Sequence, residues 1–410
     1  MDTTSTPSRL ISPPVPDRLL SLDALRGFDM IWIVGAAAIV KALSALGDIP
    51  GFKFIAQQLT HKEWAGFAFY DLIFPMFVFI VGVSLVFSLS KIIATQGKCG
   101  AIQRVVCRGV MLVLLGIFYY GGFANDWPGM RLLGVLQRIG LAYLFAGLIF
   151  CLVPARWIAG VVAGLLLGYW GLMARVPIHD ITLTRTAMVP LLAETGRTLP
   201  MDAYQHTTNR VAGIYEPGRN LAHHVDFLYL PGRLNDTYWD PEGLLSTIPA
   251  VATCLLGVCA GLLLRDKRLS ELGKVRWLFA AGIALVLVGF LWGTQFPVVK
   301  KIWSSSFVCV AGGYSCVLLG TFFLIVDVWK FQAWCQPLVW VGLNPIAVYL
   351  ADNLLGFGKL AQRLAGGDVK NYLNSHVATG TGDFAVAMLG LVLAVLFCRF
   401  LARHKIWIRL

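Results

Sequence analysis

Long apolar runs recur along this chain and are separated by short polar segments. Most of them are long enough, at about 1.5 Å of rise per helical residue, to cross the roughly 30 Å hydrocarbon core of a bilayer. They cover residues 22–46, 67–90, 109–123, 132–153, 157–174, 244–264, 277–292, 306–328, 337–357 and 384–401. The runs are continuously apolar rather than alternating every second residue, which argues against a β-barrel. The pattern predicts an all-α polytopic membrane protein with about ten transmembrane helices.

The polar segments divide the chain into four parts. Residues 1–18 are rich in Ser, Thr and Pro and predict a disordered cytoplasmic tail. Residues 19–174 hold the first five predicted helices, and residues 244–410 hold the last five. Residues 175–243 form the one long segment that is not apolar. A structureless loop of this length is uncommon, so we expect this segment to fold as an extracytoplasmic cap.

Composition and charge agree with a membrane location and suggest an orientation. The chain is 57% hydrophobic and 14% charged, with a mean hydropathy of +0.71. Placing the N-terminus inside puts 18 Lys and Arg residues in inner loops and tails, against 8 in the short outer loops. This bias predicts that both termini are cytoplasmic. The net charge of +12 then belongs to the inner membrane face and requires no nucleic-acid partner.

Metal and disulfide chemistry find no support in the residue spacing. None of the nine cysteines falls in a predicted outer loop, so the oxidising side of the membrane has no pair to couple. The chain contains neither Cys-x-x-Cys nor His-Glu-x-x-His, the spacings typical of redox or zinc sites. We therefore expect no metal.

A histidine before the second apolar run is the first candidate for chemistry. His61 and Trp64 precede Asp71 within the outer loop and the start of the run. An imidazole at a membrane boundary can transfer protons or accept an acyl group near neutral pH. Asp71 lies about 15 Å deeper on the same helix face and needs a partner, for which we expect Arg138 of the fourth run. The structural alternatives are a buried ion pair that fixes helix register and a histidine that caps a helix.

Other polar residues gather near the ends of the runs. They are Asp23, Arg26 and Asp29 in the first run, Asp240 and Glu242 before the sixth, Lys300, Lys301 and Trp303 before the eighth, and Asn344 with Pro345 within the ninth. Helix capping explains several of these carboxylates, because helix N-termini attract negative charge. Asp29 lies beyond the cap, so capping does not explain it. Pro345 predicts a kink.

Five ordered blocks resemble a known family. The blocks are Ser21–Met30, His61–Gly82, Gly134–Arg138, Asp240–Thr247 and Lys301–Phe307. Together they are similar to the heparan-alpha-glucosaminide N-acetyltransferase family, and most of all to its bacterial, NagX-like members. The resemblance implies a transmembrane acyltransferase-like bundle in a bacterial inner membrane, and it suggests a homodimer.

The resemblance also implies an activity. A member of this family would move an acetyl group from cytoplasmic acetyl-CoA to the amine of a glucosamine-type sugar on the outer side. The family's active-site histidine falls on His61. Many members carry Asn or an acidic residue where this chain reads Gly35-Ala36-Ala37-Ala38, so any polar assistance from that position must come from elsewhere.

The expected roles divide into three groups. For catalysis we expect His61 and Asp71. For the phosphates of CoA we expect the cations Arg26, Arg104, Arg108, Arg138, Lys267 and Arg268, because the inner loops 91–108 and 265–276 carry net charges of +4 and +3. The positive-inside bias alone also explains these loops. For the acceptor sugar we expect Trp64, Asp29, Asp240, Glu242, Lys301, Trp303 and Asn344.

The residues leave the mechanism and the class of function open. His61 could attack the thioester and form an acetyl-imidazole, or it could remove a proton from the acceptor while the amine attacks directly. Lys300, Ser304 or Asn344 are candidates for stabilising the oxyanion. An amino-sugar (N-acetylglucosamine) transporter would use Asp29, Asp71 and Arg138 as substrate or proton sites. A polysaccharide O-acetyltransferase would keep the histidine and change the acceptor.

Overall fold

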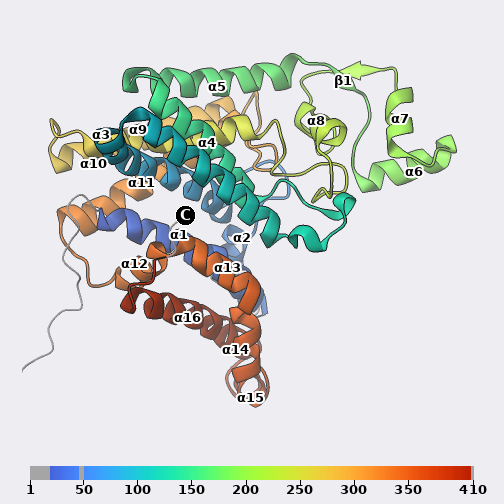
Figure 1. The fold of residues 1–410 in the computed structure, drawn as a ribbon. Helices are drawn as coiled ribbons and strands as arrows, with labels where there is room; N and C mark the ends of the chain where they lie inside the picture. The colour runs from blue at the N-terminus through green and yellow to red at the C-terminus, as the bar shows by residue number, and fades with distance from the viewer. Residues whose placement is uncertain (1–18, 46–49, 408–410) are drawn as a thin grey trace, which may run out of the picture.

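The computed structural model describes residues 19–45 and 50–407, and these residues are mostly helical (Figure 1). The long helices are α1 (Leu20–Ala45), α3 (Phe69–Tyr119), α4 (Val135–Leu152), α5 (Ala155–Arg175), α9 (Thr247–Arg265), α10 (Glu271–Trp292), α11 (Ser305–Phe322) and α16 (Thr381–Arg403). The shorter ones are α2 (Pro50–Gln58), α6 (Arg185–Thr195), α7 (Pro200–His206), α8 (Leu221–Tyr229), α12 (Gln336–Leu343), α13 (Pro345–Leu355), α14 (Phe357–Ala365) and α15 (Asp368–His376). Short turns of 3₁₀ or π helix occupy Gly122–Ala124, Trp127–Gly129 and Phe323–Val328. The predicted all-α class is confirmed, and the predicted tail at residues 1–18 lies outside the described residues.

The structure does not confirm the predicted number of membrane-spanning helices. Within the described residues, 7 helices are long and apolar enough to cross a membrane, or 8 if the bent pair α12 and α13 forms one span. The predicted count of about ten is therefore not confirmed. One of these helices, α3, contains two predicted runs, because its 51 residues are two helices joined at a kink at the non-helical Gly97. The first predicted run is also helical, as α1, which is not among the seven.

The predicted kink in the ninth run is confirmed. Helices α12 and α13 meet at Asn344 with an angle of 80° between them. Pro345 begins α13, where its missing N–H costs no helical hydrogen bond. The buried side chain of Asn344 donates a hydrogen bond to the carbonyl of Ile406 at 3.1 Å. This bond ties the break to the chain that follows α16.

Glycines bring the central helices into close contact. A Cβ atom at Gly82 of α3 would collide with the carbonyl of Cys254 in α9, and one at Gly257 would collide with the carbonyl of Phe79. Without a hydrophobic driving force between helices in lipid, such close backbone approach supplies much of the packing. This close contact holds α3, which carries part of the candidate site, against α9.

The segment between α5 and α9 folds at one end of the bundle, and we call residues 176–246 the cap (Figure 1). It contains α6, α7, α8 and two short antiparallel strands, β1 (Ile178–His179) and β2 (Arg210–Val211), in which Ile178 pairs with Val211. The cap has a small apolar core of its own, formed by Ile181, Leu183, Met188, Ala203 and Tyr204. The first turn of α1 and the last turn of α16 lie at the opposite end of the bundle (Figure 1).

Candidate functional site

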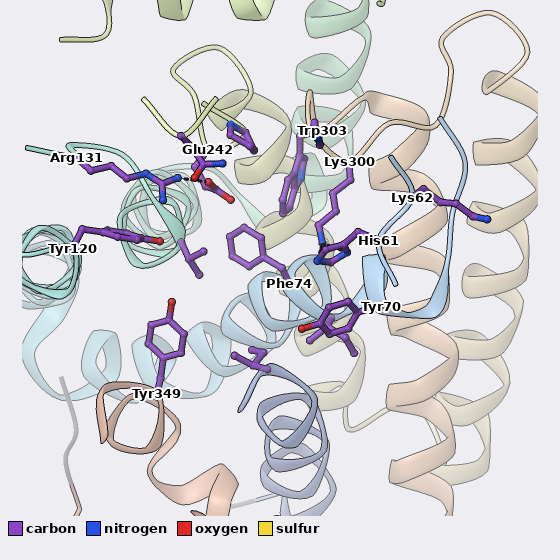
Figure 2. Close-up of a pocket in the computed structure, with 16 residues that line it drawn as sticks. His61, Lys62, Tyr70, Phe74, Tyr120, Arg131, Glu242, Lys300, Trp303 and Tyr349 are labelled. Atoms are coloured by element: carbon purple, nitrogen blue, oxygen red, sulfur yellow. Dashed lines mark hydrogen bonds and ion pairs between the residues drawn. The ribbon is translucent and has the colours of Figure 1, made fainter. Parts of the chain in front are cut away.

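A cavity of about 380 Å³ lies where the cap meets the bundle. Its volume falls in the range of roughly 300–1,000 Å³ that is usual for small-molecule sites. His61 and Lys300 stand at one side and Glu242 with Arg131 at the other, with Phe74 and Trp303 between them and Tyr349 on a further wall (Figure 2). The cavity therefore joins side chains from the loop before α3, the cap, and the loops before α4 and α11.

His61 is held in a defined orientation at its side of the cavity. Its Nδ1 lies 2.8 Å from Oδ1 of Asp71, and its ring stacks on Tyr70 with centroids 4.4 Å apart. The carboxylate of Asp71 also accepts hydrogen bonds from the backbone N–H groups of Lys62 and Ala68, at 3.3 and 3.1 Å. A carboxylate can accept a hydrogen bond only from a nitrogen that carries a proton. The neutral His61 ring therefore carries its proton on Nδ1 and presents the lone pair of Nε2. The His61 side chain is 50% exposed, so a substrate can reach it.

Lys300 completes this side of the site. Its Nζ lies 3.1 Å from Nδ1 and 3.4 Å from Nε2 of His61, and 3.7 Å from Oδ1 of Asp71. Burial lowers the pKa of Lys300 to about 8, although Asp71 acts in the opposite direction. An ammonium thus stands beside the imidazole at neutral pH, where it can stabilise a nearby developing negative charge.

Backbone pairing between two loops brings Lys300 to His61. The N–H of Gly66 donates to the carbonyl of Val298 at 2.9 Å, and Ala65 forms an isolated β-bridge with Val299. The hydroxyl of Ser304, which caps α11, accepts the N–H of Val299 at 3.0 Å. Residues 239 positions apart in the chain therefore meet because these short loops are bonded to each other.

The opposite side of the cavity is built around two carboxylates of the cap. Arg131 donates two hydrogen bonds to Asp240, at 3.1 and 2.8 Å, and a third to Glu242 at 2.9 Å. Burial raises the pKa of Glu242 to about 7, and the neighbouring Asp240 acts in the same direction. Arg131 also lies over the ring of Tyr120, 4.5 Å from its centroid. The guanidinium therefore fixes both carboxylates.

Aromatic and aliphatic side chains form the floor. Trp303 is 1% exposed, its indole donates to Thr253 Oγ1 at 3.0 Å, and its φ of 51° is uncommon for an aromatic residue. Phe74 packs edge-on against it, with centroids 5.1 Å apart. A second pocket of about 20 Å³ adjoins the cavity. The two share the lining residues Ile33, Phe74, Val135 and Tyr349. It has room for about one water, so a longer group can enter it only if these side chains move.

The predicted partner of Asp71 was wrong. Arg138 is 1% exposed and donates instead to the hydroxyl of Ser246 and to the carbonyl of Gly243, the latter at 3.2 Å. Its guanidinium lies 5.0 Å from the centroid of the Trp303 ring. The rise along the helix predicts the depth of Arg138 but not the direction of its side chain. The Arg138 side chain points to the start of α9, whereas the Asp71 side chain points to His61 and Lys300.

The predicted acceptor residues fall into two groups. Glu242, Lys301 and Trp303 line the cavity. The other four are not among its lining residues. Asp240 accepts hydrogen bonds from Arg131, and Trp64 donates to the carbonyl of Tyr215 at 2.8 Å. Asn344 donates to the carbonyl of Ile406, and Asp29 is fully buried in α1. No described residue donates a hydrogen bond to either carboxylate oxygen of Asp29.

The cations predicted to bind CoA do not form a single cluster. Arg26 is bonded to Asp23, to Ser84 and to the carbonyl of Gly342. Arg104 is exposed on the second half of α3, and Arg108 lies over the ring of Tyr143 at 4.8 Å. Lys267 and Arg268 are exposed in the turn between α9 and α10. Their role in binding the donor stays a prediction.

Sequence reasoning gave too little weight to Lys300 and missed Arg131 and Tyr70. Lys300 was a candidate only for the oxyanion, because nothing in the spacing places it beside a histidine 239 positions away. Arg131 was counted only as a loop charge. An arginine before one span and the acidic pair Asp240 and Glu242 before another could have indicated an ion pair, since opposite charges near a membrane are stable mainly when paired.

Comparison with known proteins identifies the same family that the sequence blocks resemble. Residues 18–197 match the family model described as heparan-alpha-glucosaminide N-acetyltransferase, catalytic. The chain is 26% identical to the human heparan-alpha-glucosaminide N-acetyltransferase over 394 residues, which cover 83% of this chain and 53% of that protein. It is 26% identical to the mouse protein over 336 residues, covering 72% and 49%. The predicted resemblance to this family is confirmed, and the resemblance to its bacterial, NagX-like members stays a prediction. The chain spans about half the length of the curated relatives it matches.

Proposed function

We propose that this chain is a multi-pass membrane N-acetyltransferase that transfers an acetyl group from acetyl-CoA to the amine of a glucosamine-type sugar. The match to the catalytic family model over residues 18–197 supports the class of reaction. The observation that carries the proposal is His61 in an open cavity, oriented by Asp71 at 2.8 Å and accompanied by Lys300 at 3.1 Å. Acyl transfer requires a nucleophile or base, a group that orients it, and a nearby cation.

In this proposal each of these residues has a task. Asp71 keeps the proton of neutral His61 on Nδ1, so that Nε2 faces the reacting atoms. In direct transfer, Nε2 takes a proton from the acceptor nitrogen as this nitrogen bonds to the acetyl carbon, the C–S bond breaks, and the thiolate receives the proton. In the two-step route, Nε2 itself bonds to the acetyl carbon first, the C–S bond breaks, and CoA leaves as the thiolate. The amine then bonds to the same carbon, the bond to Nε2 breaks, and the proton that the amine loses balances the one that the thiolate gains. The ammonium of Lys300 stabilises the oxyanion in both routes.

The proposed topology places donor and acceptor on opposite sides of the membrane. We place the cap and the cavity mouth outside and both termini in the cytoplasm, as the Lys and Arg count favours. Acetyl-CoA would then approach from the cytoplasmic side, and its pantetheine arm would need to pass the narrow pocket below the cavity. That pocket holds only about 20 Å³, so the proposal requires Phe74, Tyr349 or their neighbours to shift when the donor binds.

The test is release of free CoA thiol by the purified protein in detergent. With acetyl-CoA and glucosamine, we expect turnover that depends on the acceptor, and we expect His61→Ala to abolish it. His206→Ala, an exposed histidine of the cap, is the matched control and should keep full activity. Turnover that survives in His61→Ala removes this residue from the mechanism.

The same preparation separates the alternatives. Uptake of labelled N-acetylglucosamine into vesicles without acetyl-CoA would favour a transporter. Transfer to hydroxyl-bearing polysaccharides, with no preference for amines, would favour an O-acetyltransferase. An acceptor panel therefore decides the chemical class of the reaction.

A further inference from the structure

The charges around the cavity are distributed unevenly. Its described lining residues include one carboxylate, Glu242, and several cations: Lys62, Arg131, Lys300 and Lys301. An amino sugar near neutral pH is itself largely an ammonium ion, and most of this wall repels it. Glu242 is therefore the lining side chain that attracts such an acceptor.

Glu242 belongs to a group of mostly buried charges. The carboxyls of Asp226, Asp240 and Glu242 interact with the guanidiniums of Arg131 and Arg138, and Glu242 also interacts with Lys300. Burial raises the pKa of both Asp226 and Glu242 to about 7. Within this group Glu242 is the carboxylate that lines the cavity, so it is the one that an entering ammonium can reach.

The carboxylate of Glu242 is also held in place before any ligand binds. Arg131 donates to its Oε2 at 2.9 Å, and its backbone N–H donates to Oδ1 of Asp240 at 3.0 Å. Asp226 anchors the same turn by accepting the N–H of Leu244 at 2.8 Å. The Glu242 side chain is 14% exposed, so it reaches the cavity yet is largely shielded from water. A preorganised and partly desolvated carboxylate loses little entropy on binding a cation.

We propose that Glu242 is the entry subsite for the amine: its carboxylate binds the primary ammonium of the acceptor sugar on the side of the cavity opposite His61, and the amine leaves Glu242 as the free base to reach His61 when it reacts. This inference rests on the proposed function and adds the group that recognises the acceptor. It also explains how product is released. Acetylation converts the ammonium into a neutral amide, which has no net charge for Glu242 to hold, so the product binds more weakly than the substrate.

Binding measured without turnover tests this proposal. Isothermal titration of the full chain in detergent, without acetyl-CoA, compares glucosamine with N-acetylglucosamine at pH 7.5. We expect the unchanged protein to prefer glucosamine by about tenfold or more, and Glu242→Gln to remove that preference while leaving the affinity for N-acetylglucosamine nearly unchanged. Glu216→Gln is the matched control, because this cap carboxylate is 66% exposed and bonds to Arg219. It should keep the preference.

Two further measurements keep the outcome clear. Glu242→Asp retains the charge and should retain a preference for the ammonium, which loss of folding alone would not allow. A Glu242→Gln protein that still prefers glucosamine overturns the amine subsite. If the unchanged protein turns over amines while Glu242→Gln keeps its glucosamine affinity, only the subsite is wrong. If the unchanged protein neither releases CoA with amines nor prefers glucosamine, both proposals are wrong.

Discussion

At the scale of single residues, the site depends on which charges are brought beside one imidazole. His61 is flanked by Asp71, which orients it, and by Lys300, which adds a cation within 3.4 Å of both ring nitrogens. The carboxylate and the ammonium also lie 3.7 Å apart, so the three side chains form one cluster.

Lys300 leads to a prediction about pH. Burial lowers its pKa to about 8, so the ammonium dominates below that pH and is lost as pH rises through it. If the ammonium stabilises the oxyanion, kcat for acetyl transfer should fall above about pH 8. Lys300→Arg should remove this decline, and Lys300→Met should reduce kcat by about 10²-fold or more at all pH values. The measurement is the pH dependence of CoA release.

The control for Lys300 is Lys330→Met, which changes an exposed lysine beyond the end of α11 and should leave the profile unaltered. A basic decline that is the same in Lys300→Arg and in the unchanged protein would show that another group controls it.

At the scale of helices, close backbone contact determines where the site residues stand. Gly82 and Gly257 allow α3 and α9 to touch, and Gly27 with Gly342 does the same for α1 and α12. The helices so joined carry the lining residues Ile33 and Phe74 and the buried Asp71 that orients His61, and α9 follows the loop of Glu242. A change in helix spacing would therefore reach the cavity even though no glycine lines it.

Substitution of these glycines should destabilise the bundle. Gly257→Ala places a methyl group against the carbonyl of Phe79, so the helices must separate, at a cost of about 1–3 kcal/mol. We expect a lower melting temperature in detergent and reduced transferase activity. Gly164→Ala in α5 is the matched control, because a Cβ atom there meets nothing within 4 Å. Equal melting temperatures for the two variants would contradict close packing between α3 and α9.

At the scale of the whole molecule, the cap lies at one end of the bundle, and the first turn of α1 and the last turn of α16 lie at the other (Figure 1). Net positive charge gathers in the loops away from the cap, including the segments that contain Lys98 and Lys267. The positive-inside rule favours the proposed orientation, with the cap and the mouth of the cavity outside. In that proposal the acceptor side faces the exterior and the basic loops face cytoplasmic acetyl-CoA.

Cysteine labelling tests this orientation. Cys99 is exposed just after the break at Gly97 and should face the cytoplasm. A membrane-impermeant maleimide added to intact cells should leave Cys99 unmodified and should label it after permeabilisation, as measured by mass. Glu216→Cys in the cap supplies the opposite control and should react from outside. Labelling of Cys99 in intact cells would reverse the proposed topology.

Much of this protein follows from local sequence pattern. Continuous apolar runs indicate helices because a bilayer leaves backbone groups no partner except each other, and the break at Asn344-Pro345 follows from the missing N–H of proline. His61 stands out because a titratable ring beside an apolar span is unusual. The sequence also separates the two apolar runs of α3, and the non-helical Gly97 breaks the helix between them.

The partners within the site were decided only by tertiary structure. Asp71 meets Lys300 because Gly66 bonds to Val298, and Arg138 turns toward Ser246 because α9 packs beside α4. Glu242 enters the cavity because Arg131, 111 positions away, holds it there. Helical rise gives the depth of a side chain from sequence alone. Its direction and its partner depend on contacts between distant segments, which form only when the whole bundle and its cap have packed.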